Sequence, residues 1–321
     1  MKRFSFLKYL LAAIPIIWIF SRINFKDLTF VIAQTSWWTI PVLLLSNLLV
    51  LFLQGIRWWL LIRTFLPEVS LTRTLSFHFI GVFYSVILPS SASQDFVRAI
   101  LISREQDYSV IWASTWISRL LGMIVLFILS LYGFFSLSDT ETVKSLEYLV
   151  ISFFIILCIF IALSFSKRTT RPFRGLIKKI SPAKLFSGFE RIRNGIYLYR
   201  ERKKDIALVF IITLCTHLIL FISAAFIILG ISGKLFIAEA LAYIPLIEFA
   251  CMTVPITPNG MGLRELLSKA MFDHLGLSSE QLGVYILVFL FSTLLRLTGG
   301  IPLLFLKSKK SGLSRQHKNH M

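Results

Sequence analysis

The chain has 321 residues, of which 56% are hydrophobic and 14% aromatic, and its mean hydropathy is +0.77. This composition excludes a soluble domain, and the length exceeds that of a single membrane anchor, so we expect a polytopic helical membrane protein. The formal net charge of +18 is concentrated beside apolar segments. That distribution is typical of a cytoplasmic membrane edge facing anionic lipid headgroups, and not of nucleic-acid binding.

Eight apolar segments follow one another along the chain. They lack the alternating pattern of membrane strands, and we expect about six of them to be full spanning helices. The first is expected to be a retained helix, because no small-residue cleavage site follows it. The predicted spanning helices are 6–21, 37–62, 109–136, 148–165, 206–230 and 281–306, and two further segments, 74–88 and 237–256, run into breaks.

The first break comes directly after residue 88. Pro89 ends the apolar segment, because proline lacks the N–H that a continuing helix needs. The serines that follow, Ser93 among them, are residues that cap a new helix. A short charged helix is predicted at 94–104, so that 74–104 forms a re-entrant hairpin.

The second break has the same form, and 237–272 is predicted to be another re-entrant hairpin. The spanning helix after each hairpin carries Arg-x-x-Gly, as Arg119 with Gly122 and as Arg296 with Gly299. Glycine permits the tight backbone turns that such a tip needs. The predicted tip residues of the second hairpin are Pro258, Asn259, Gly260 and Gly262.

The two halves therefore predict an inverted repeat within a single membrane domain, 1–321. Repeat 1 covers 37–136, repeat 2 covers 206–306, and the proline of each break lies 52 residues after the start of its repeat. If the basic segments are cytoplasmic, the first hairpin enters from the cytoplasm, the second enters from outside, and both chain termini are cytoplasmic. Corresponding broken segments in two halves indicate a substrate site at their interface.

The connecting segment, 148–205, contains the strongest run of charge. Thirteen Lys or Arg residues lie between Lys167 and Lys204, and five more follow from Lys307 onward. Apolar residues recur at helical spacing between these charges. This pattern predicts amphipathic helices on the inner leaflet that anchor and orient the protein.

Charged side chains inside apolar segments are costly unless they are paired or face water, so each is a candidate site residue. Arginine binds phosphate through a planar fork that stays charged, and a helix that begins within the membrane offers free backbone N–H groups to an anion. These features predict a substrate site for an anion between the two hairpins. Its predicted ligands are Asp95, Arg98, Arg119, Arg264, Glu265 and Arg296.

Other roles for these residues stay open. Asp95 with Arg119, and Glu265 with Arg296, are alternatively ion pairs that hold each hairpin against its neighbouring helix. Glu248 lies in the segment before the second break and has no counterpart in the first half. It is a candidate for coupling transport to a proton gradient, or else a satisfied polar group.

Motifs for catalysis or metal binding are missing from the sequence. It contains no zinc-binding, phosphate-loop or serine-hydrolase motif, and no Asp-x-Asp for a metal-bound nucleotide sugar. His78 and His217 are single histidines in apolar surroundings and are interpreted as structural, as are the three cysteines. We therefore expect a protein that is not an enzyme and that uses no cofactor or metal.

The residues around the breaks resemble those of a known family. Asp95-x-x-Arg98, Arg119-x-x-Gly122 and Pro255-x-x-Pro258-Asn259-Gly260-x-Gly262-x-Arg264-Glu265 are similar to the flippase-like transmembrane domain of lysylphosphatidylglycerol synthases. The resemblance spans nearly the whole chain, but members commonly have Gly-Gly where this chain has Ser93-Gln94. It implies a role in moving lipids between leaflets, such as aminoacylated phospholipids, polyprenyl-phosphate-linked sugars or hopanoid-type lipids. Synthase activity is not expected, because that activity belongs to a soluble domain without a counterpart here.

The sequence thus predicts a flippase or transporter in the cytoplasmic membrane that moves an anionic phospholipid or a polyprenyl-phosphate-type lipid. The alternative is a non-catalytic membrane subunit that scaffolds a glycosyltransferase or another lipid-modifying enzyme. The fold is predicted to be all-α, with two broken re-entrant hairpins arranged as inverted repeats.

Overall fold

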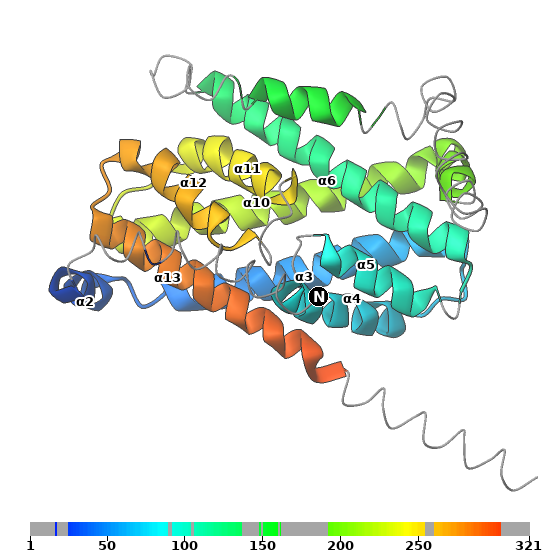
Figure 1. The fold of residues 1–321 in the computed structure, drawn as a ribbon, viewed down its shortest axis with the longest axis horizontal. Coiled ribbons are helices and arrows are strands. Elements are labelled where there is room, and N and C mark those ends of the chain that lie inside the picture. Colours follow the sequence, from blue (N-terminus) through cyan, green and yellow to red (C-terminus); the bar gives the residue numbers. More distant parts are fainter. Residues whose placement is uncertain are drawn as a thin grey trace, which may run out of the picture.

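The computed structural model describes residues 17, 25–88, 92–103, 106–136, 148, 150–159, 161, 192–253 and 260–302. Within these residues the chain is helical and contains no strand (Figure 1). The expectation of an all-helical membrane protein is therefore confirmed. The main helices are α2 (Phe25–Gln34), α3 (Thr39–Arg63), α4 (Leu71–Ile87), α5 (Ser93–Ile102), α6 (Tyr108–Ser136), α10 (Lys203–Ser232), α11 (Ile237–Thr253), α12 (Leu263–Phe272) and α13 (Ser279–Leu295), with 3-10 turns η1 (Tyr199–Glu201), η3 (Asp273–Leu275) and η4 (Arg296–Gly300).

Among the described residues, four helices are long and apolar enough to cross a membrane: α3, α6, α10, and α13 together with η4. They coincide with four of the predicted spanning runs. The predicted helix 6–21 lies outside the described residues except for Ile17, and the basic segment 162–191 lies outside them entirely. Within the predicted run 148–165 the described apolar helix is Val150–Ile159, which is shorter than a full span. The predicted number of spans therefore stays a prediction.

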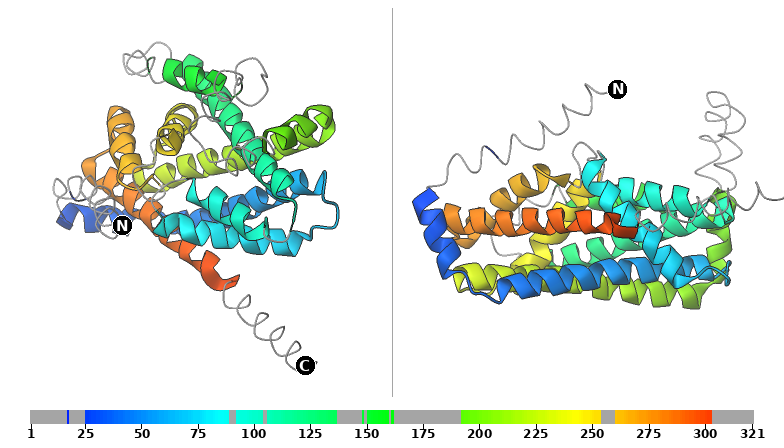
Figure 2. Two further views of the ribbon diagram at one scale, coloured as in Figure 1. Left: turned by 45° about the vertical axis from the view of Figure 1, so that its right-hand side comes forward. Right: turned by 90° about the horizontal axis from the view of Figure 1, so that it is seen from below.

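The long helices lie side by side along the longest axis of the molecule (Figures 1 and 2). α3 and α10 pack against each other over most of their length and run in opposite directions. α6 packs against α11, while η4 at the end of α13 packs against α4. The largest buried apolar cluster joins residues of α6, α10, α11 and α13, and the stacked rings of Phe153 and Phe249, 3.6 Å apart, fix the helix Val150–Ile159 to it.

The shorter helices form two pairs, α4 with α5 and α11 with α12, which lie toward opposite ends of the long axis in Figure 1. Ser70 caps α4 by accepting a hydrogen bond from the backbone N–H of Arg73. All four helices begin and end within three residues of the predicted segments. Pro89, Pro258 and Asn259 lie outside the described residues.

Candidate functional site

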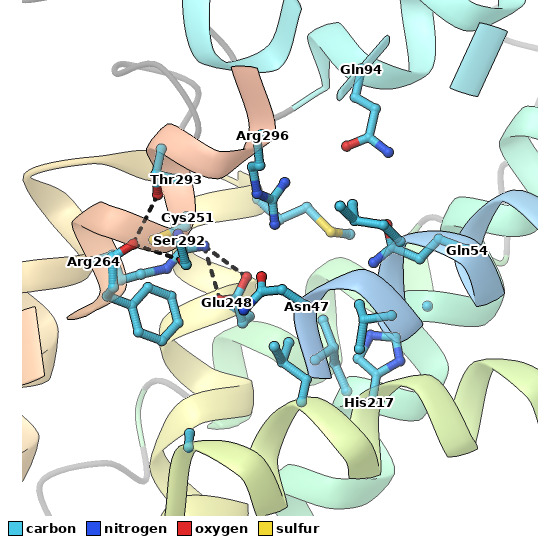
Figure 3. A pocket seen from close by; sticks show the side chains of 18 of the residues that line it. Asn47, Gln54, Gln94, His217, Glu248, Cys251, Arg264, Ser292, Thr293 and Arg296 are labelled. Atoms are coloured by element: carbon cyan, nitrogen blue, oxygen red, sulfur yellow. Dashed lines mark hydrogen bonds and ion pairs between the residues drawn. The ribbon is translucent and has the colours of Figure 1, made fainter. Parts of the chain in front are cut away.

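A cavity of about 200 Å³ lies among the long helices, and its walls come from both halves of the chain. Figure 3 shows polar side chains from several helices pointing into it. Within the described part of the chain, the ionisable groups on its wall are mostly arginines. They are Arg57 of α3, Arg98 of α5, Arg119 of α6, Arg264 of α12 and Arg296 of η4, against the two carboxylates Asp95 of α5 and Glu248 of α11, with His217 of α10 alongside.

In the first half, Asp95 holds two arginines together. Its carboxylate oxygens lie 2.7 Å from Nη2 of Arg98 and 2.9 Å from Nη1 of Arg119. Arg98 is buried, donates to Nδ1 of His78 at 3.0 Å and lies over the ring of Trp58 at 4.4 Å. The imidazole therefore accepts at Nδ1, because a guanidinium can only donate. One carboxylate, one imidazole and one aromatic face together hold Arg98 in place.

Arg119 also reaches into the second half of the chain. Its Nη2 donates to the backbone oxygen of Met252 at 3.4 Å, one residue before α11 ends at Thr253. The last carbonyls of a helix have no partner within the helix, and the negative end of the helix dipole attracts a cation. Arg119 therefore links α5, through Asp95, to the broken end of α11.

In the second half, Arg264 is paired with a residue of the preceding helix. Its Nη2 lies 2.9 Å from each carboxylate oxygen of Glu248, as the dashed lines in Figure 3 show. The guanidinium also lies over the ring of Phe289, 5.3 Å from its centre. This ion pair joins α12 to α11 at the wall of the cavity.

Glu265 does not take part in that pair. It is buried, and its side chain accepts a hydrogen bond from the backbone N–H of Gly262, which caps the start of α12. A glutamate three positions into a helix is well placed to reach back in this way. Gly260 and Gly262 have φ of +75° and +84°, a conformation that favours glycine at this turn.

Arg57 and Arg296 differ from the other three arginines of the cavity. Within the described residues neither forms an ion pair or a hydrogen bond, and Nε and Nη1 of Arg57 are buried without a partner. In Figure 3 Arg296 points into the cavity, and no dashed line reaches it. These two guanidinium groups are therefore free to bind an anion.

The structure brings most of the predicted ligands to one place: Asp95, Arg98, Arg119, Arg264 and Arg296 all line the cavity, together with Glu248. The predicted Asp95–Arg119 ion pair is present. No ion pair joins Glu265 to Arg296 in the described part of the chain, and Glu265 is not on the cavity wall, because its carboxylate caps α12 instead. Ser93 begins α5 and is buried outside the lining.

Sequence reasoning missed Arg57, and it interpreted His217 as structural although His217 lines the cavity. The signal for Arg57 was present: it is the one charged residue between Thr39 and Ile62 in an otherwise apolar run. Asn47 and Gln54 lie on the same helix and also line the cavity.

A comparison with protein families assigns the chain to a family. The family described as "Lysylphosphatidylglycerol synthase TM region" matches residues 5–300. The chain belongs to this family. The match includes every helix from α2 to η4, and so the entire wall of the cavity.

The lysylphosphatidylglycerol synthase TM region family is related to lipid modification or flipping, and its member here is a multi-pass membrane domain with four described helices of spanning character. No curated protein and no solved structure matches the chain.

Proposed function

We propose that this chain moves an anionic lipid, either a phospholipid or a polyprenyl-phosphate-type lipid, between the leaflets of the cytoplasmic membrane and is not itself an enzyme. The observation that carries this proposal is the cavity with five arginines among apolar helices. Buried charge at membrane depth is costly and is a mark of a substrate path. A headgroup crossing the bilayer needs such a polar path, while its acyl chains stay in the lipid.

The packing of the helices supports an inverted repeat in which α3, α4, α5 and α6 correspond to α10, α11, α12 and α13. Exchanging the two sets of helices under this correspondence leaves the pair of α3 and α10 unchanged. It turns the contact of α6 with α11 into a contact of α13 with α4, and η4 at the end of α13 packs against α4. The two short pairs lie toward opposite ends of the molecule (Figure 1). Transporters built from such repeats bind substrate between the halves and expose it alternately to each side.

The orientation follows from the basic residues. The end of α3 at Arg63 and the start of α10 at Lys203 lie at the same end of the molecule in Figure 1. Under the positive-inside rule this end is cytoplasmic, and both chain termini are cytoplasmic too. The pair α4 and α5 then enters from the cytoplasm, and the pair α11 and α12 enters from outside.

The test is lipid translocation by the purified full chain in vesicles that contain fluorescent phosphatidylglycerol or phosphatidic acid, with a membrane-impermeant quencher outside. We expect the chain to accelerate exchange between leaflets, and Arg296→Gln to slow it by at least about tenfold, the effect of losing one charged hydrogen-bonding partner. The matched control is Arg63→Gln, because Arg63 is exposed at the end of α3 and does not line the cavity.

A second set of vesicles with an imposed pH gradient tests the predicted role of Glu248 in proton coupling. Exchange that proceeds at the rate of protein-free vesicles, with and without the gradient, would sink the proposal. Copurification of a lipid-modifying enzyme or a glycosyltransferase in equal amounts would then favour the scaffold alternative.

A further inference from the structure

The charges on the cavity wall do not balance. Asp95 is shared by Arg98 and Arg119, and Glu248 is used by Arg264. Five arginines against two carboxylates leave three positive charges in excess. The sequence between α4 and α5 at 89–91, and between α11 and α12 at 254–259, contains no ionisable side chain.

The backbone segments that carry the two arginines without an ion pair both lie close to α4. Gly55, two residues before Arg57, lies so close to α4 that a Cβ there would be 3.3 Å from the ring of His78 and 2.5 Å from the side chain of Leu75. Gly299, three residues after Arg296, lies so close that a Cβ would be 2.4 Å from the backbone oxygen of Phe79.

Adjacent residues of α4 therefore contact the backbones that carry Arg57 and Arg296. The charges of both arginines, and that of Arg98, also reach His78 electrostatically. The two arginines, one from each half of the chain, also line the same cavity.

Phosphate chemistry distinguishes the ligands that such a site favours. A phosphodiester headgroup carries one negative charge, whereas a phosphomonoester carries about −1.5 to −2 at neutral pH because its second pKa is about 6. Arginine binds the oxygens of phosphate through two parallel hydrogen bonds. Two guanidinium groups without ion-pair partners, in a cavity with excess positive charge, favour binding of a dianionic phosphate. They repel a headgroup that carries an additional ammonium group.

We infer that the cavity selects a phosphate group with two negative charges, a lipid phosphomonoester or diphosphate, over a phosphodiester headgroup, and that Arg57 and Arg296 bind it directly. The inference rests on the proposed function, because it assigns a headgroup to the same cavity. Arg57 thereby becomes a specificity-determining residue.

The experiment compares binding of dioleoyl phosphatidic acid and dioleoyl phosphatidylglycerol to the full chain in mild detergent, titrated by native mass spectrometry at pH 8 and pH 5. The two lipids have the same acyl chains, so a difference reports the headgroup. We expect phosphatidic acid to bind at least about tenfold more tightly at pH 8, with the preference shrinking at pH 5, where the monoester keeps one charge. Arg57→Gln and Arg296→Gln should each remove most of the preference, whereas Arg63→Gln should keep it.

A thermal unfolding scan of the same variants separates binding from folding. Removing an unpaired buried charge breaks no ion pair, so Arg57→Gln and Arg296→Gln should melt at or above the wild-type temperature. A fall in melting temperature together with equal loss of both lipids would assign the two arginines a structural role and overturn the inference.

Three further results have definite meanings. Equal affinity for the two lipids at pH 8, with translocation intact, overturns the headgroup selection but leaves the proposed function standing. Absence of both binding and translocation removes the proposed function and the inference with it. Displacement of phosphatidic acid by inorganic phosphate at equal concentration overturns the lipid assignment and makes soluble phosphate the ligand.

Discussion

The two short charged helices, α5 and α12, have an acidic residue at the same position, but the two carboxylates make different contacts. Each has ten residues and carries an acidic residue at its third position, Asp95 in α5 and Glu265 in α12. Asp95 binds Arg98 of its own helix and Arg119 of α6. Glu265 turns back and caps its own helix.

The length of the side chain accounts for this difference. Glutamate has the extra methylene with which capping boxes reach back to the N-cap N–H, and aspartate does not. Arg119 is paired with a carboxylate, while Arg296, in the matching Arg-x-x-Gly motif, has no ion pair within the described residues. The acidic residues at the same position of these two helices therefore have different roles: Asp95 binds two arginines, and Glu265 caps α12.

The largest effect should come from the residue that holds the first half together. Asp95→Ala leaves Arg98 and Arg119 without their shared carboxylate, and we expect it to lower the free energy of unfolding by about 3–5 kcal/mol. Denaturant or thermal unfolding in detergent measures this. The control is Asp273→Ala, which removes an exposed ion pair with Lys269 at 2.8 Å and should cost less than about 1 kcal/mol. Similar losses in the two variants would contradict the architectural role of Asp95.

A smaller effect on stability is expected at Glu248, whose pair involves one arginine. Glu248→Gln should lower the free energy of unfolding by about 1.5–3 kcal/mol and, by adding to the excess positive charge, tighten binding of phosphatidic acid. If Glu248 also couples transport to protons, the variant should translocate lipid at the same rate with and without a pH gradient. A rate that still responds to the gradient as the wild type does would exclude that coupling role.

The smallest effect is expected at Glu265, and it tests whether this carboxylate caps α12 or binds the lipid. Glu265→Gln keeps an oxygen that accepts from the N–H of Gly262, so stability and lipid binding should stay near wild type. Glu265→Ala removes the cap and should cost about 1 kcal/mol. Weakened lipid binding in the Gln variant alone would show instead that the negative charge of Glu265 acts in the site.

The helices were predictable because their signals are local. Long apolar runs and the two breaks located α3, α4, α5, α6, α10, α11 and α12 to within a few residues, whereas α13 ends at Leu295 and gives way to η4, before the predicted end at 306. Helix periodicity and proline chemistry act over short stretches of chain, so one sequence suffices to find them.

The pairing of charges was only partly predictable, because it depends on directions that the sequence does not encode locally. Asp95 and Arg119 were matched correctly, since each has few partners nearby. Arg264 was expected beside the substrate, yet it also binds Glu248, 16 residues earlier. Arg57 was overlooked, and the packing of α3 against α10 places it at the cavity.

The contact between Arg119 and the backbone oxygen of Met252 has a thermodynamic consequence. One guanidinium serves both Asp95 on α5 and the end of α11, so whatever displaces either group changes the free energy of the other. Substitutions at Asp95 and near the end of α11 should therefore be non-additive, with a coupling energy of about 0.5–3 kcal/mol in a double-mutant cycle.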